Sequence, residues 1–212
     1  VEGTEFPRDH PEWVLGPQYS PWLKRNNWML NLGNPEARRA ITEKISTLIE
    51  EAGVTVYRQD FNLGGVPAFW AAADAPDRVG MAEIRHIEGL YAFWDELLAR
   101  HPGLVIDNCA GGGTRIDLET ISRSVPLWRS DIQCAEDFDP IAMQTQTQGL
   151  ALWVPLSTGC CREPTTYACR SALGPGMVVA WSTAPVEQGV AMPVGKIRAL
   201  MAEAAAMRQY FY

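Results

Sequence analysis

The chain has 212 residues, of which 47% are hydrophobic and 20% are charged. This composition is ordinary for globular proteins and the length allows one sizeable core, so we expect residues 1–212 to form a single domain. The net charge of −7 and the isoelectric point near 5.0 make nucleic acids and anionic membranes unfavourable partners. No stretch approaches the roughly 18 apolar residues of a membrane span.

The cysteine and histidine content argues against a metal centre. Five cysteines are present, an odd number, and none lies in a CxxC motif. Only three histidines accompany them, so a zinc cluster has few ligands, and we expect neither a metal nor a cofactor. The pattern indicates reduced thiols and a cytoplasmic protein. Because the chain begins with Val1, a trimmed leader remains an alternative. Assembly into a homo-oligomer also stays open.

Strands and helices are predicted to alternate after a proline-rich opening, residues 6–21, that reads as a loop. Asn34-Pro35 is a typical helix start, because Asn caps and Pro fits the first turn, and Gly53 is a typical stop. The predicted strands are residues 28–32, 54–59, 104–108, 126–130, 150–155 and 177–181. The predicted helices are residues 34–53, 81–101, 117–122, 141–148, 166–173 and 194–210.

This alternation predicts an α/β fold with short, buried strands. About six strand–helix units suit either an open doubly wound sheet or most of a (β/α)8 TIM barrel. A complete barrel needs about 250 residues. The chain is shorter and begins mid-pattern, so we expect an incomplete barrel, roughly units 3 to 8, in a fragment of a longer protein.

Polar side chains gather where three predicted strands end: Arg58, Asp60, Asn62, Asp107, Asn108, Cys109, Arg129, Ser130 and Asp131. In parallel α/β sheets and barrels this edge carries the active site. Two carboxylates at nearby strand ends are the minimum for glycoside hydrolysis, because one attacks or activates water while the other protonates the leaving oxygen. A single aspartate at such a position is more often a helix cap or an ion-pair partner. The pattern alone leaves both interpretations open.

A glycine-rich turn, residues 109–115 (CAGGGTR), follows one of these strands and precedes a helix. Glycines there let backbone N–H groups approach a ligand. The turn matches neither the P-loop nor the GxGxxG pattern, and a mobile turn without a ligand is the alternative.

Three segments resemble motifs of glycoside hydrolase family 36. Residues 57–62 (YRQDFN) resemble the K-W-D-M-N of that family, residues 107–117 (DNCAGGGTRID) its E-N-C-S-S-G-G-G-R-F-D, and residues 128–131 (WRSD) its W-T-S-D. The three occur in the order of the family, each at the end of a predicted strand. The resemblance implies a (β/α)8 barrel that hydrolyses terminal α-galactosides with retention of configuration.

The resemblance also implies roles for individual residues. Asp60 would be the nucleophile and Asp131 the acid/base. Arg58 stands where the family has a lysine that contacts sugar hydroxyls, and Trp128 would form a pocket wall beside Asp131. The remaining residues that would line the galactose pocket are Asn62, Cys109, Gly112 and Arg115.

The sequence departs from the family motifs at Arg58, Gln59, Ala110, Gly111 and Thr114, which replace lysine, tryptophan, two serines and a glycine. These changes affect sugar recognition more than the carboxylate pair. The main alternative is therefore that the chain is a non-catalytic fragment that binds carbohydrate or serves as a scaffold. A sugar-phosphate enzyme is a further, less favoured alternative.

Charged residues lie on both sides of Asp131 in the sequence. Arg123 and Arg129 flank Asp131 in the sequence, and a nearby positive charge would oppose an acid that must hold its proton. The acidic run at Glu136, Asp137 and Asp139 lacks EF-hand spacing, so a solvated loop is favoured over a calcium site.

Overall fold

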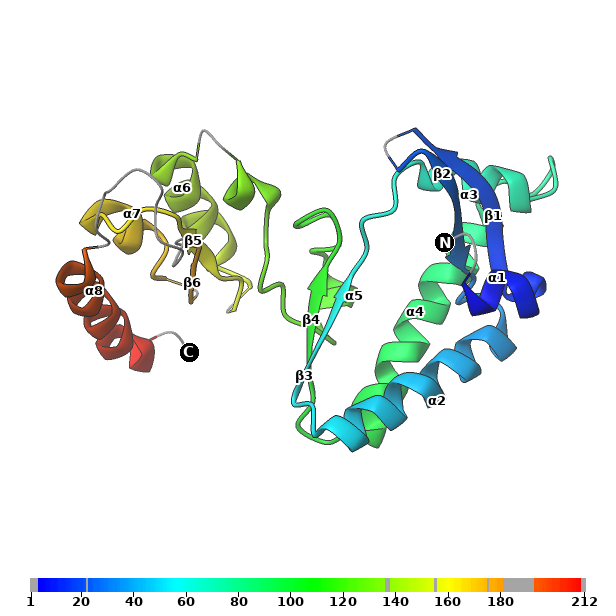
Figure 1. Ribbon diagram of the computed structural model, residues 1–212, viewed down its shortest axis with the longest axis horizontal. Helices are drawn as coiled ribbons and strands as arrows, with labels where there is room; N and C mark the ends of the chain where they lie inside the picture. Colours follow the sequence, from blue (N-terminus) through cyan, green and yellow to red (C-terminus); the bar gives the residue numbers. More distant parts are fainter. Residues whose placement is uncertain are drawn as a thin grey trace. The chain divides into compact units, whose positions relative to one another are not determined.

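The computed structural model describes residues 4–21, 23–135, 138–154, 156–174, 176–180 and 193–210. The chain divides into two compact units, which we describe separately (Figure 1). Unit 1 comprises Val1–Tyr57 with Phe61–Ile106, and unit 2 comprises Arg58–Asp60 with Asp107–Tyr212. Both acidic side chains of the predicted site, Asp60 and Asp131, fall in unit 2.

The elements of unit 1 are α1 (Glu5–Asp9), the 3-10 turn η1 (Pro11–Trp13), β1 (Val14–Ser20), β2 (Arg25–Leu30), α2 (Pro35–Ala52), the start of β3 (Val56–Asp60), α3 (Val66–Ala73), α4 (Met81–Arg100) and the start of β4 (Val105–Cys109). Helix α2 begins and ends as predicted. The Asn34 side chain accepts hydrogen bonds from the backbone N–H groups of Glu36 and Ala37, and Gly53 ends the helix in a left-handed conformation with φ 61°.

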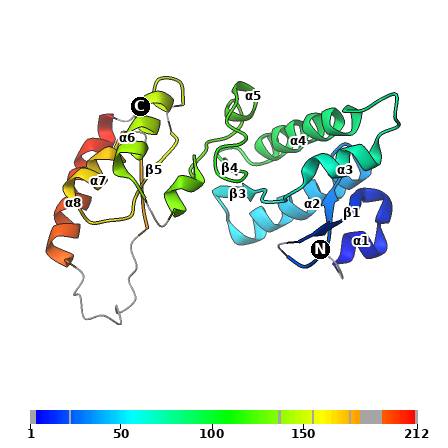
Figure 2. The same ribbon diagram turned by 90° about the horizontal axis from the view of Figure 1, so that it is seen from above.

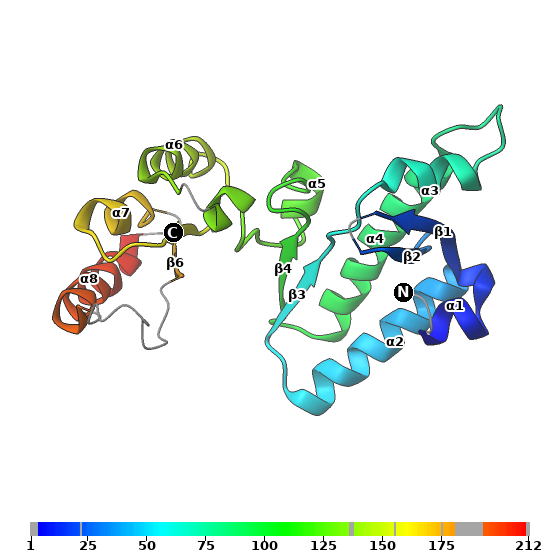
Figure 3. The same cartoon turned by 45° about the horizontal axis from the view of Figure 1, so that its top comes forward.

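Helices α2 and α4 lie side by side and form the main core of unit 1 (Figure 3). The fully buried Trp94 and Leu97 of α4 pack in a cluster with Ile49 of α2 and Ile106 of β4. Such burial of large apolar surface is the principal stabilising contribution to a domain of this size. The core therefore fixes the residues from which β3 and β4 start.

The prediction of a loop for residues 6–21 is wrong, because this segment contains most of α1, η1 and strand β1. Strand β1 pairs antiparallel with β2, with a register shift between Leu15 and Gln18. The shift contains Gly16 at φ 115°, where an added Cβ would lie 2.9 Å from the Asn27 carbonyl oxygen. Gly16 and Pro17 interrupt the alternation that identifies a strand, which explains the error.

The β1–β2 hairpin and α3 form a second, smaller core in unit 1. Phe69 and Trp70 of α3 are buried together with Met29 of β2. Helix α3 lies beside the hairpin (Figure 3). The sequence did not predict α3, whose residues (VPAFWAAA) are nearly all apolar and so show no polar face.

The elements of unit 2 are the ends of β3 and β4, α5 (Leu118–Ile121), the 3-10 turn η2 (Asp131–Cys134), α6 (Pro140–Leu150), β5 (Gly159–Cys161), α7 (Thr166–Ser171), β6 (Met177–Val179), α8 (Val194–Met207) and the 3-10 turn η3 (Arg208–Tyr210). Strands β5 and β6 are parallel, with Gly159 opposite Met177. Buried cysteines and alanines of β5 and α7 pack with Met143 of α6 and Leu200 of α8. Figure 2 shows α6, α7 and α8 near one another in unit 2.

Two of the predicted strands do not form. Residues 126–130 are irregular, with a single bridge between Val125 and Asp107 beside them. Residues 150–154 continue from α6 into a turn, because the N–H groups of Trp153 and Val154 both bond to the Leu150 carbonyl oxygen. Pro155 and Trp181, the ends of two predicted strands, and the acidic pair Glu136 and Asp137 lie outside the described residues.

The described strands pair two by two, β1 with β2, β3 with β4, and β5 with β6. The alternation of β3, α4, β4 and α5, followed by β5, α7, β6 and α8, confirms the predicted α/β class. Among the described residues, no helix has both the length and the hydropathy needed to cross a membrane.

Candidate active site

Strand β3 presents Arg58 and Asp60 on one face, because side chains two residues apart in a strand point the same way. The Asp60 carboxylate is the last side chain of the strand and is 37% exposed. One arm of the Arg58 guanidinium reaches it, with Nη2 lying 3.4 Å from Asp60 Oδ2. The negative charge of Asp60 is thus close to a fixed positive charge while the carboxylate stays accessible to a ligand.

The other arm of Arg58 donates to Asp107 on β4, and the distance from Nη1 to Oδ2 is 2.5 Å. The Asp107 side chain is only 7% exposed, and its second oxygen, Oδ1, accepts a hydrogen bond from the Leu127 backbone N–H at 3.0 Å. Burial opposes the charge on Arg58, but the hydrogen bond and charge of Asp107 outweigh it and raise the pKa of Arg58 above its usual range. Asp107 therefore holds Arg58 charged and in place.

Cys109 ends strand β4 beside Asp60. Its side chain is buried, and burial raises the pKa of the thiol. A hydrogen bond with Asp60 raises this pKa further, against a smaller opposing effect of Arg58. A thiol held protonated is a poor nucleophile but a usable hydrogen-bond donor to a carboxylate. The geometry favours the interpretation of Cys109 as a pocket-lining thiol over that of a nucleophile.

The glycine-rich turn packs directly against the segment that carries Asp131. Gly112 has φ 74°, and a Cβ added there would lie 2.6 Å from the Asp131 backbone nitrogen and 2.9 Å from Ser130 Cα. A Cβ on Gly113 would clash with the Arg129 carbonyl oxygen. Glycine is required at both positions because the two backbones approach so closely. This close packing explains why glycine occupies these positions, which a mobile turn without contacts does not explain.

Asp131 begins the 3-10 turn η2 and is exposed. Ser130 caps this turn by accepting a hydrogen bond from the Ile132 N–H at 3.2 Å. The indole Nε1–H of Trp128 donates to Asp131 Oδ1 at 3.1 Å. Trp128 therefore contacts the predicted acid/base directly, as expected of a residue beside it.

Arg115 contacts backbone. Its Nη2 donates to the Cys109 carbonyl oxygen at 2.7 Å and to the Gln59 carbonyl oxygen at 3.2 Å. These two carbonyls belong to the last residues of β4 and β3, so Arg115 joins the ends of the two strands. A role for Arg115 in binding galactose hydroxyls stays a prediction.

The two arginines that flank Asp131 in the sequence have partners elsewhere. Arg123 donates to the carbonyl and carboxylate oxygens of Glu119 at 2.8 Å. Arg129 is 3% exposed and donates to the Met143 carbonyl oxygen and to Thr147 Oγ1 at 3.0 and 2.6 Å. Burial lowers the pKa of Arg129 to about 10.

The structure brings most of the predicted site into unit 2. Asn62 belongs to unit 1 and is exposed; the residues that share unit 2 are Arg58, Asp60, Cys109, Gly112, Arg115, Trp128 and Asp131. The sequence noted Asp107 as a polar strand end but assigned it no role. An arginine on one strand end and an acidic residue on the next was the available signal.

Within the described part of the chain, no group of acidic, histidine or cysteine side chains is arranged to hold a metal.

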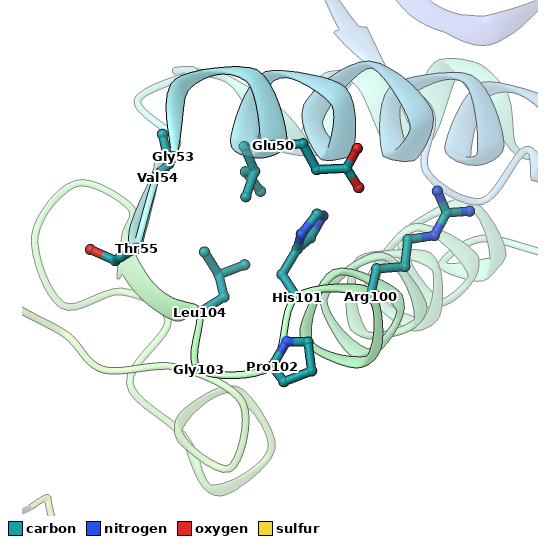
Figure 4. Close-up of a pocket in the computed structure, with 10 residues that line it drawn as sticks. Glu50, Gly53, Val54, Thr55, Arg100, His101, Pro102, Gly103 and Leu104 are labelled. Carbon is teal, nitrogen blue, oxygen red and sulfur yellow. The ribbon is translucent and has the colours of Figure 1, made fainter.

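Unit 1 also contains a hollow of about 490 Å³ at the residues that precede β3 and β4 (Figure 4). Glu50, Thr55, Arg100 and His101 contribute its polar side chains, and backbone around Gly53 and Gly103 also lines it. The Arg100 guanidinium is already paired with Glu43 and Glu96, and His101 Nε2 lies 2.8 Å from Ser46 Oγ. The hollow therefore lies where β3 and β4 begin, and its guanidinium and imidazole already have partners.

Known proteins resemble this chain over most of its length. The family model described as Melibiase matches residues 2–162. The chain belongs to the melibiase family. An α-galactosidase of Escherichia coli is 33% identical over 152 residues, which are 70% of this chain and 19% of that protein. Alpha-galactosidase 1 of Pediococcus pentosaceus is 27% identical over 151 residues, 71% of this chain and 20% of the relative.

Solved structures share the fold of this melibiase-family chain. A variant of the GH36 α-galactosidase AgaA of Geobacillus stearothermophilus, in complex with stachyose, superposes with a TM-score of 0.74 at 20% identity, covering 99% of this chain and 30% of that one. The α-galactosidase of Lactobacillus brevis gives 0.71 at 18% identity, covering 98% and 28%. Together with the family match over residues 2–162 and the α-galactosidase relatives, this shared fold confirms the resemblance to glycoside hydrolase family 36. The chain spans about a fifth of the length of the curated relatives it matches.

Proposed function

We propose that the protein is a retaining glycoside hydrolase that releases terminal α-linked galactose, with Asp60 as nucleophile and Asp131 as acid/base. The observation that carries the proposal is the environment of Asp60. This accessible carboxylate ends a strand between the Arg58 guanidinium and the Cys109 thiol. Both neighbours stabilise the ionised form that a nucleophile needs.

In the proposed mechanism, Asp60 attacks the anomeric carbon while Asp131 protonates the departing glycosidic oxygen. Asp131, now ionised, then takes a proton from water, which displaces Asp60 and releases the sugar. Trp128 supports the second step, because its N–H donates to the ionised Asp131. The Gly112 turn supports both steps by packing against the Asp131 backbone.

We further propose an oligosaccharide with a terminal α-galactosyl group as substrate. Two solved structures with the same fold support this choice. They are variants of AgaA from Geobacillus stearothermophilus, one in complex with stachyose and one with raffinose. The (β/α)8 architecture is part of the same proposal. In it, the chain contributes roughly units 3 to 8 of the barrel, and the site lies at the carboxyl ends of the strands.

The decisive experiment is hydrolysis of an aryl α-galactoside by the full-length protein and its Asp60→Ala and Asp131→Ala variants. We expect both to lose at least about 1,000-fold in kcat/KM, because each removes a group that takes part in bond making or breaking. Azide should restore turnover of Asp60→Ala by occupying the space of the nucleophile. Asp77→Ala, which removes an exposed carboxylate of unit 1, is the matched control and should retain full activity.

The alternative, a non-catalytic carbohydrate-binding protein, predicts a different set of results. The wild-type protein would then bind galactose in calorimetry without hydrolysing the aryl galactoside. Normal turnover by Asp60→Ala would refute the assignment of the nucleophile. A crystal structure with a galactose analogue supplies an independent check, because retention requires the two carboxyl groups about 5–5.5 Å apart across the sugar.

A further inference from the structure

Two buried cysteines of unit 2 lie in direct contact. Cys161 is the last residue of β5, Cys169 lies in α7, and their Sγ atoms are 2.7 Å apart. Their exposed fractions are 0% and 2%. A disulfide bond is about 2.05 Å long, so a small shift of either side chain brings the sulfurs to bonding distance.

The local backbone explains why the two sulfurs meet. Both thiols face the Glu163 carbonyl oxygen, with Cys161 Sγ at 3.0 Å and Cys169 Sγ at 3.9 Å from it. Thr165 caps the start of α7 by accepting from the Ala168 N–H at 3.2 Å, which turns the chain back over β5. The pair is therefore held by a short, well-bonded connection.

Two thiols in contact are the geometry of a dithiol that can be oxidised. In the described ranges, no further acidic, histidine or cysteine side chain forms a metal-binding group with them.

We propose that Cys161 and Cys169 are a redox-sensitive pair that forms a disulfide on exposure to a peroxide. One thiolate attacks a peroxide oxygen, the O–O bond breaks, and a sulfenic acid and water result. The other thiol attacks the sulfenic sulfur, the S–O bond breaks, and a second water leaves. Two thiols lose two electrons and two protons, and hydrogen peroxide is reduced to two waters.

The other cysteines of the chain have different surroundings. Cys160 precedes Cys161 in β5, so its side chain points to the opposite face of the strand, and burial raises the pKa of its thiol. Cys134 is exposed on η2. Cys109 is hydrogen-bonded to Asp60. The contact between the sulfurs of Cys161 and Cys169 thus selects this pair.

Peptide mapping of the full chain tests the proposal directly. Trypsin cuts after Arg129, Arg162 and Arg170, so Cys169 lies in peptide 163–170, while Cys134, Cys160 and Cys161 share peptide 130–162. After treatment with hydrogen peroxide, we expect these two peptides to be joined with a loss of two hydrogens, and dithiothreitol to separate them. The join should survive in Cys134→Ser and Cys160→Ser and disappear in Cys161→Ser and Cys169→Ser.

A second readout is thermal unfolding of the intact chain. Closing a short loop should raise Tm by about 5 °C in the oxidised wild type and leave Cys169→Ser unchanged. Peroxide treatment that yields only sulfinic or sulfonic acid at Cys161, or that joins Cys134 to Cys160 instead, would overturn the proposal. The wild-type map decides between these results even where a serine variant does not fold.

Discussion

The guanidinium of Arg58 lies between two carboxylates, with Nη1 2.5 Å from Asp107 Oδ2 and Nη2 3.4 Å from Asp60 Oδ2. Its planar fork allows one side chain to contact both, which the single ammonium of a lysine does less well. Asp107 also accepts from the Leu127 N–H, so the buried carboxylate joins β3, β4 and the segment that leads to Trp128. Asp107 thus acts on the proposed nucleophile through Arg58.

We predict that Asp107→Asn lowers kcat on an aryl α-galactoside by about 10- to 100-fold while KM changes less. The amide oxygen keeps the acceptor for the Leu127 N–H, but the charge that fixes Arg58 is lost. Steady-state kinetics of the full-length protein measure both constants. Asp77→Asn removes a comparable charge from an exposed site and should have no effect. An equal rise of KM with unchanged kcat would assign Asp107 to substrate binding instead.

Arg58→Lys is expected to lower kcat/KM by about 10-fold, and Arg58→Met by about 100-fold. Lysine keeps the positive charge but does not span Asp60 and Asp107, whereas methionine leaves Asp107 buried and unpaired. The measurement is the ratio of kcat/KM values at one pH. If Arg58→Lys is as active as the wild type, the fork of Arg58 contributes nothing that the family lysine lacks.

The glycine turn offers a matched pair of substitutions. Gly112→Ala places a Cβ 2.6 Å from the Asp131 nitrogen, whereas Gly111→Ala, also at positive φ, meets nothing nearer than Thr114 Cγ2 at 4.0 Å. In both variants the left-handed backbone costs about 1 kcal/mol of the free energy of unfolding. We expect Gly112→Ala to lose about 3 kcal/mol in free energy of unfolding and at least 100-fold in kcat, because Asp131 must move. Urea unfolding and kinetics on both variants check this, and comparable losses in Gly111→Ala would refute the close-packing explanation.

Replacing the buried Arg129 should stabilise the protein. Its pKa of about 10 lies below the ordinary value of an arginine, so the folded chain binds the proton less tightly than the unfolded chain. This penalty is fully present below pH 10 and is relieved as the pH rises from 10 toward the ordinary pKa of arginine. We expect Arg129→Met to gain about 1–3 kcal/mol in free energy of unfolding at pH 7, since lost hydrogen bonds to Met143 and Thr147 offset part of it.

The advantage of Arg129→Met should shrink when unfolding is repeated at pH 10.5. Arg123→Met is the comparison, because its guanidinium pairs with the exposed Glu119, and it should change stability by less than about 0.5 kcal/mol. A net loss of stability in Arg129→Met at pH 7 would mean that its hydrogen bonds to Met143 and Thr147 outweigh the burial of charge.

Local signals predicted the elements that position the site. Asn34, Pro35 and Gly53 marked the bounds of α2, and the short β-branched segment 54–59 (VTVYRQ) marked the strand that ends in Asp60. These are short-range effects of capping and side-chain alternation. The positions of the strand ends also predicted that Arg58, Cys109 and Asp131 would lie at one edge of the sheet, and all three fall in unit 2.

Features that depend on distant contacts were not predictable. An arginine and an acidic residue on successive strand ends hinted at the Arg58–Asp107 pair, but the contact also requires the register of β3 against β4, which the sequence of either strand does not specify. Strand β1 was missed because Gly16 and Pro17 read as a turn, although the β2 backbone accommodates them. Residues 126–130 read as a strand, yet the neighbouring contact is a single bridge at Val125. Tertiary packing overrides propensity in each case.

Arg115 has a consequence for engineering this site. Its guanidinium holds the carbonyls of Gln59 and Cys109, so the span between two strand ends is set by a side chain from the turn itself. Transplanting residues 110–114 from a relative should thus alter what the turn touches without moving the strands beneath it, provided that Arg115 is kept.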